Sequence, residues 1–88
     1  MRKPMVAGNW KMNKTVADGV KLVEELVPMI NGISGVDRVV CPPFTALYSV
    51  SQVLKGSEIG CGAQDLFWEA KGAYTGEVAP DMVAELGQ

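Results

Sequence analysis

The chain has 88 residues, of which 48% are hydrophobic and 20% are charged. This composition is typical of a globular domain and excludes an intrinsically disordered chain. A formal net charge of −2, without any basic run, lacks the electrostatic footprint of a nucleic-acid-binding protein. No window approaches the roughly 18 apolar residues of a membrane span, and the N-terminal apolar run is too short for a secretory signal. We therefore expect a cytoplasmic protein without nucleic-acid or membrane partners.

The residue types that metal and proton chemistry most often use are scarce. Because the chain has no histidine, a zinc site is not expected. The cysteines, Cys41 and Cys61, have a spacing that matches no metal motif, and their apolar surroundings predict buried, reduced thiols. No dinucleotide fingerprint occurs, since Asp65 stands where the glycines at 60 and 62 would need a third. We expect neither a metal nor a cofactor.

The first predicted elements are a short strand and a long amphipathic helix. The run Pro-Met-Val-Ala at residues 4–7 predicts a strand. Thr15, with Asp18 three residues later, is typical of a capping box at a helix start. Pro28 is expected to tighten or end this helix, and the Asn-Gly pair at residues 31–32 to close the turn. The apolar residues at helical spacing are Val16, Val20, Val23, Val27 and Ile30.

A second strand and helix follow. Residues 37–41, Asp-Arg-Val-Val-Cys, predict the strand, and the helix is predicted to begin near Thr45. Gly56 suits the left-handed position that often follows a helix. The apolar stripe of this helix consists of Leu47, Val50, Val53 and Leu54.

Residues 58–63 predict a third strand, which their glycines weaken. Pro80 is predicted to lie in the first turn of a third helix that reaches Gly87. The apolar positions of this helix are Met82, Val83 and Leu86. Strands that alternate with helices predict an α/β fold with a parallel sheet, in one domain of three βα units over residues 1–88.

The segment from residue 65 to residue 78 is long for a loop between a strand and a helix, which usually has about 2–6 residues. It carries Phe67, Trp68 and Tyr74, and exposed aromatic side chains need a surface that buries them. Two interpretations stay open on the residues alone: a loop folded onto its own sheet, or a loop that contacts a partner. Its carboxylates could be functional, although no two have a spacing that identifies an acid/base pair.

Polar residues follow the first predicted strand directly, in the motif Ala-Gly-Asn-Trp-Lys-Met-Asn at residues 7–13. In parallel α/β sheets, ligands bind at the carboxyl ends of strands. The ammonium group of Lys11 is a compact charge that suits an anionic substrate. Residue types alone leave two interpretations, an anion site or an ordinary polar loop.

Four motifs occur in order along the chain. They are residues 7–13, residues 39–45 (Val-Val-Cys-Pro-Pro-Phe-Thr), residues 62–65 (Gly-Ala-Gln-Asp) and residues 72–77 (Gly-Ala-Tyr-Thr-Gly-Glu). Together they resemble the triosephosphate isomerase family over nearly the whole chain. That family has a TIM (β/α)8 barrel of about 250 residues. The resemblance therefore implies the N-terminal third of such a barrel, βα units 1 to 3, and we expect a truncated barrel with parallel strands.

The resemblance implies an enzyme, an aldose–ketose isomerase of glycolysis and gluconeogenesis. It would interconvert dihydroxyacetone phosphate and D-glyceraldehyde 3-phosphate. Asn9 and Lys11 would bind the phosphorylated triose, and Lys11 would also stabilise the oxyanion of the enediolate electrostatically. Since the family's catalytic histidine and glutamate fall beyond residue 88, we expect this chain alone to be inactive.

The resemblance also implies a homodimer in which the third loop protrudes into the partner subunit. Thr75 at the loop tip would reach the partner's first loop, and Gln64, Tyr74 and Glu77 would be supporting interface positions. The alternative is a non-catalytic βα module that self-associates or binds anions through Lys11.

Overall fold

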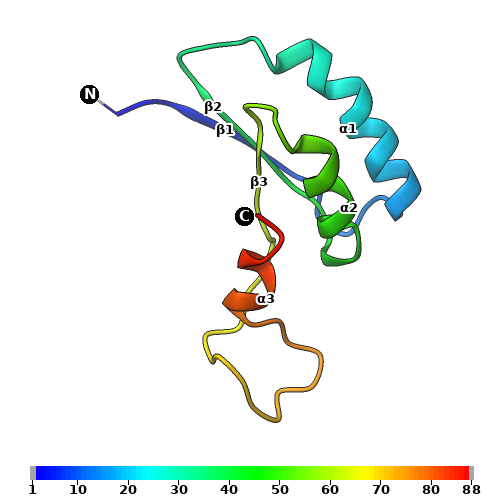
Figure 1. Ribbon diagram of the computed structural model, residues 1–88, viewed down its shortest axis with the longest axis vertical. Coiled ribbons are helices and arrows are strands. Elements are labelled where there is room, and N and C mark those ends of the chain that lie inside the picture. The colour runs from blue at the N-terminus through cyan, green and yellow to red at the C-terminus, as the bar shows by residue number, and fades with distance from the viewer. Residues whose placement is uncertain (1, 88) are drawn as a thin grey trace.

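The computed structural model describes residues 2–87 as three strands and three helices in the predicted alternating order. The elements are β1 (Met5–Asn9), α1 (Val16–Ile30), β2 (Asp37–Cys41), α2 (Phe44–Leu54), β3 (Gly60–Cys61) and α3 (Pro80–Ala84). The strands form one parallel sheet in the order β1-β2-β3, which confirms the predicted α/β class. In Figure 1 the chain between β3 and α3 projects away from the strands and from α1 and α2.

The predicted cap of α1 is confirmed, because the Thr15 hydroxyl accepts a hydrogen bond from the Asp18 amide at 3.3 Å. The helix continues through Pro28 to Ile30, the last apolar position predicted for it, and is capped by Asn31, where the turn was predicted. The end of the helix is bonded to β2, because Arg38 donates to the carbonyl oxygens of Ile30 and Asn31, the latter at 2.8 Å. These bonds satisfy carbonyls at the end of the helix that have no partner within it.

The strands differ in how well their predicted bounds agree with the structure. β2 has the predicted bounds, whereas β1 starts one residue later than predicted and extends to Asn9, because Gly8 and Asn9 pair with Val40 and Cys41 of β2. The prediction of a strand over residues 58–63 is wrong at both ends, since β3 contains only two residues. In the described chain β3 pairs only with β2, and its glycines add little packing to that pairing.

The hydrophobic core lies between the sheet and the two longer helices. Its buried members are Val23, Val40, Ala46, Val50, Leu54 and Ile59. Leu47 is fully buried as well, so the stripe predicted for α2 is largely confirmed, with Val53 only partly buried. α2 begins one residue before Thr45, and Gly56 after it has φ = +87°, the left-handed conformation predicted there.

α3 begins at Pro80 as predicted but ends at Ala84, short of Gly87. Val83 is buried, whereas Met82 is 53% exposed, so the predicted apolar set is wrong at Met82. The chain after the helix turns tightly, with the amides of Leu86 and Gly87 bonded to carbonyls three residues earlier. Within α3, therefore, Val83 is the only buried residue.

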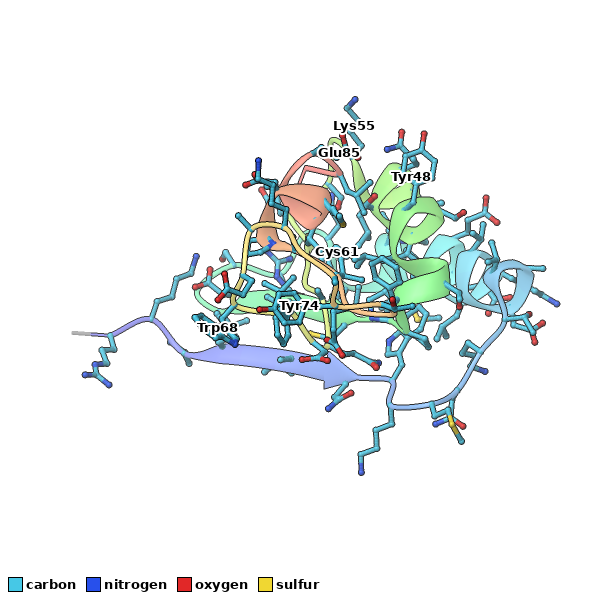
Figure 2. The ribbon with its side chains drawn as sticks, turned by 90° about the horizontal axis from the view of Figure 1, so that it is seen from below. Tyr48, Lys55, Cys61, Trp68, Tyr74 and Glu85 are labelled. Carbon is cyan, nitrogen blue, oxygen red and sulfur yellow. The ribbon has the colours of Figure 1, made fainter. Side chains whose placement is uncertain are left out.

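In Figure 2, α1, α2 and α3 lie on the same side of β1, and the core cluster joins α1 and α2 to β2. Every residue of β1 is exposed, including Met5 and Val6. The prediction of buried thiols is too strong, since Cys41 and Cys61 have intermediate exposure. Between residues 2 and 87, no helix combines the length and the hydrophobicity that crossing a membrane requires.

Candidate functional site

The carboxyl ends of the three strands meet around the loop that follows β1. The amide of Trp10 donates to the carbonyl oxygen of Cys41 at 3.2 Å, which binds the start of this loop to the end of β2. The side-chain amide of Gln64, three residues after β3, donates to the same carbonyl at 2.8 Å and to the carbonyl of Lys11 at 2.9 Å. The loop is therefore hydrogen-bonded to residues at the ends of both other strands, where α/β proteins bind ligands.

Lys11 has φ = +55°, a left-handed backbone conformation that residues with side chains rarely adopt. For an L-residue this conformation costs about 1–2 kcal/mol. Two side chains hold it in place: the Asn9 Oδ1 accepts from the Lys11 amide at 2.9 Å, and Gln64 donates to the Lys11 carbonyl. Strained residues with such support are concentrated at functional sites.

The loop is also anchored from below by Trp10. Its indole packs against the core cluster beneath α1, so close to Gly19 that a Cβ there would lie 3.0 Å from the ring. The Asn13 side chain donates to the Trp10 carbonyl at 2.8 Å and closes the turn on its other side. No role was predicted for Trp10 or Asn13, because neither contact has a signature in the local sequence.

The electrostatics of this loop favour an anion. Asn9 and Lys11 are exposed, as a ligand site requires. The ion pairs within residues 2–87 join Lys3 to Asp37 and Arg38 to Glu58, so no described carboxylate neutralises the Lys11 ammonium. The side-chain oxygen of Asn9, Oδ1, accepts a hydrogen bond from the Lys11 amide. The side-chain NH2 group of Asn9 therefore remains to donate to a ligand oxygen. Together the two side chains can bind an anionic oxygen.

The structure separates the remaining predicted site residues into two groups. Gln64 lies at the strand ends with Lys11, whereas Tyr74, Thr75 and Glu77 lie exposed on the long loop. The ring of Tyr74 packs on that of Phe67, with centroids 4.5 Å apart and a tilt of 40°. Figure 2 shows Tyr74 on this loop together with Trp68, whose side chain is 80% exposed.

The long loop has an ordered base and turn. The Phe67 amide donates to the Val78 carbonyl at 2.8 Å, which joins the two arms of the loop, and the Glu77 amide donates to the Tyr74 carbonyl at 3.0 Å. Gly72, with φ = +149°, allows the Tyr74 ring to lie where a Cβ would approach it to 2.7 Å. The loop therefore folds on its own side chains while leaving several of them exposed.

Comparison with known proteins gives the same family throughout. The family model described as triosephosphate isomerase matches residues 4–88. Proteins named triosephosphate isomerase from Endomicrobium trichonymphae and Pelobacter propionicus are each 54% identical to the chain over 87 residues. These alignments cover 99% of this chain and 35% of each relative.

A solved structure agrees with the sequence matches. The crystal structure of triosephosphate isomerase from Bartonella henselae superposes with a TM-score of 0.88 at 30% identity, over 98% of this chain and 35% of that one. The chain thus spans about a third of the length of the relatives it matches, and its three βα units match part of a TIM barrel enzyme. By sequence and by fold, the chain belongs to the triosephosphate isomerase family.

Proposed function

We propose that this chain supplies the first three βα units of a triosephosphate isomerase, which interconverts dihydroxyacetone phosphate and D-glyceraldehyde 3-phosphate. The observation that carries the proposal is the left-handed Lys11, held at the strand ends by Asn9 and Gln64 with an unneutralised ammonium group. A small, phosphorylated substrate suits this charge, and the relatives' names support the reaction.

Lys11 and Asn9 have different roles in binding the substrate. The Lys11 ammonium attracts the phosphate in the ground state and stabilises the negative charge that develops on the substrate oxygen in the transition state. The side-chain NH2 group of Asn9 donates to a substrate oxygen, while Oδ1 of the same side chain accepts the hydrogen bond from the Lys11 amide. The reaction also needs a proton-transfer pair, a role that we assign to neither Asn9 nor Lys11. That pair comes from the part of the barrel that this chain does not span.

We also propose that the active protein is a cytoplasmic homodimer, with Gln64, Tyr74, Thr75 and Glu77 at or near the interface. Support comes from the exposed apolar side chains of the long loop, among which Trp68 is 80% exposed. A groove of about 760 Å³ lies beside the first loop, lined by Trp10, Met12, Thr45 and others. Exposed aromatic side chains next to polar residues are typical of protein–protein interfaces.

The decisive experiment is an isomerase assay of the chain alone and of the chain combined with the complementary part of a relative. The enzyme from Caldanaerobacter subterraneus, 54% identical over 87 residues, is a suitable donor. We expect no turnover above buffer for the chain alone and clear turnover for the combination. In the combination, Lys11→Ala should lower kcat/KM by roughly 100-fold or more, the scale of losing an electrostatic stabiliser.

Lys21→Ala is the matched control, because Lys21 is also exposed but lies on α1. It should leave kcat/KM unchanged. The comparison distinguishes an effect of the position of the Lys11 charge from an effect of the net charge. If the chain alone turned over substrate and Lys11→Ala abolished this activity, the proton-transfer groups could not lie only in the complementary part, as we propose. An unchanged kcat/KM for Lys11→Ala in the combination would show that Lys11 is an ordinary loop residue.

A further inference from the structure

The end of α1 is held by three residues from different segments, Asn31, Arg38 and Glu58, which we call the α1 junction. The Arg38 guanidinium group donates to the Asn31 carbonyl at 2.8 Å and forms an ion pair with the Glu58 carboxylate at 3.2 Å. The Glu58 amide donates to Oδ1 of Asn31 at 2.7 Å, and the Asn31 amide donates to the Val27 carbonyl at 2.9 Å. The junction therefore fixes the backbone amide, the backbone carbonyl and the side-chain oxygen of Asn31.

Gly32 follows Asn31, and such a pair can react spontaneously, because asparagine is chemically labile. The Gly32 nitrogen attacks Cγ of Asn31, so that a new N–C bond forms, the Cγ–Nδ2 bond breaks, and the proton of the attacking nitrogen leaves with the ammonia. Water then opens the resulting five-membered succinimide at either carbonyl, which gives aspartate or isoaspartate. Nothing is oxidised or reduced. Glycine favours the attack, because it has a flexible backbone and no Cβ that would hinder its nitrogen.

The folded structure opposes this ring closure. Asn31 is helical, with φ = −61° and ψ = −35°, whereas the ring closes when the backbone leaves the helical ψ and Cγ turns toward the next nitrogen. The Glu58 amide holds the side chain of Asn31, and Arg38 holds its carbonyl. Because both donors come from segments distant in sequence, local opening of the junction releases the two restraints together. Water already has access, since Gly32 is exposed.

We propose that Asn31 is a modification site, where the closed α1 junction prevents spontaneous deamidation and the open junction allows it. The other two asparagines, Asn9 and Asn13, do not precede a glycine. Isoaspartate adds a carbon to the backbone at the end of α1, so the carbonyls that Arg38 binds lose their spacing. Deamidation thus makes an opening of the junction irreversible. This inference does not depend on the proposed isomerase function.

The test incubates the chain at mildly alkaline pH, with and without urea, and follows the amide-to-acid change at Asn31 by mass spectrometry of its peptides. We expect the folded chain to react at least roughly 10-fold more slowly than the chain in urea, because only the open state reacts. Arg38→Met should raise the rate in the folded chain roughly 5- to 100-fold, because it removes charged hydrogen bonds that keep the junction closed.

Two control variants separate the chemistry from the stability of the fold. Gly32→Ala should nearly abolish the reaction in urea, and it should keep the fold, since a Cβ at Gly32 would meet no atom within 4 Å. Leu47→Ala removes a fully buried side chain outside the α1 junction, and it should destabilise the whole chain more than Arg38→Met does. It should nevertheless accelerate deamidation less than Arg38→Met.

The comparison of Arg38→Met with Leu47→Ala decides the proposal. A larger acceleration by Leu47→Ala would overturn it, because Asn31 would then react only after global unfolding. Equal rates with and without urea would overturn it as well, since the junction would give no protection. So would a rate in urea that Gly32→Ala does not lower, because the reaction would not pass through the succinimide.

Discussion

Two regions of this chain, residues 5–61 and residues 62–87, differ in how much of their apolar surface they bury themselves. In residues 5–61, β1, β2 and β3 pack under α1 and α2, and the whole core cluster lies there. Residues 62–87 form a long loop and the short α3. Their only buried apolar residues are Ala79 and Val83, and Trp68 is 80% exposed. The first region is stabilised by its own periodic apolar residues, whereas the second has aromatic residues that it does not cover itself.

The largest difference between the regions should appear on removing core volume. Leu47→Ala, at a fully buried position on α2, should lower the free energy of unfolding by about 2–5 kcal/mol. Met82→Ala, at a half-exposed position on α3, should lower it by less than about 0.5 kcal/mol. Urea denaturation followed by circular dichroism measures both. Equal losses would mean that the second region is as well packed as the first.

Arg38→Met should have the next largest effect. It removes the donor that binds the Ile30 and Asn31 carbonyls at the end of α1, so we expect a loss of about 1–3 kcal/mol in the free energy of unfolding. The control is Lys3→Met, which breaks the exposed ion pair with Asp37 and should cost at most about 1 kcal/mol. If Lys3→Met lowered the free energy of unfolding more than Arg38→Met, the hydrogen bonds from Arg38 would not stabilise the end of α1 as we expect.

A smaller effect is expected in the long loop, where Tyr74 packs on Phe67. Such an aromatic pair contributes about 0.5–1.5 kcal/mol beyond its burial. Because the loop has no residue in the core cluster, Tyr74→Leu should mainly increase local opening of the loop and should lower the free energy of global unfolding by no more than this amount. Limited trypsin digestion should then cleave faster after Lys71, while cleavage after Lys55, which follows α2, keeps its rate. Identical cleavage rates at Lys71 would show that the ring pair does not order the loop.

Trp68→Ser should have the smallest effect on the free energy of unfolding, because the side chain is mostly exposed. Its effect should appear in association instead. We expect the isolated chain to self-associate or to bind a hydrophobic dye, since β1 and the long loop expose apolar side chains. Trp68→Ser should weaken this association in analytical ultracentrifugation. A compact monomer with a sharp thermal transition and no dye binding would contradict the expectation.

Elements whose determinants are local could be read from the sequence. The start of α1 follows from Thr15, which caps the helix within three residues. β2 follows from an apolar run, the turn after α2 from Gly56, and the start of α3 from Pro80. The four family motifs likewise predicted the barrel family, because residue order alone carries them.

Only the tertiary structure decided features that depend on distant residues. Arg38 of β2 binds the carbonyls at the end of α1, and β1 continues to Asn9 because β2 pairs with it. The sequence suggested Gln64 only as an interface position, and the structure places its amide on the Lys11 carbonyl. Local propensity cannot predict these outcomes, because each depends on a hydrogen bond between segments that are brought together only when the sheet forms.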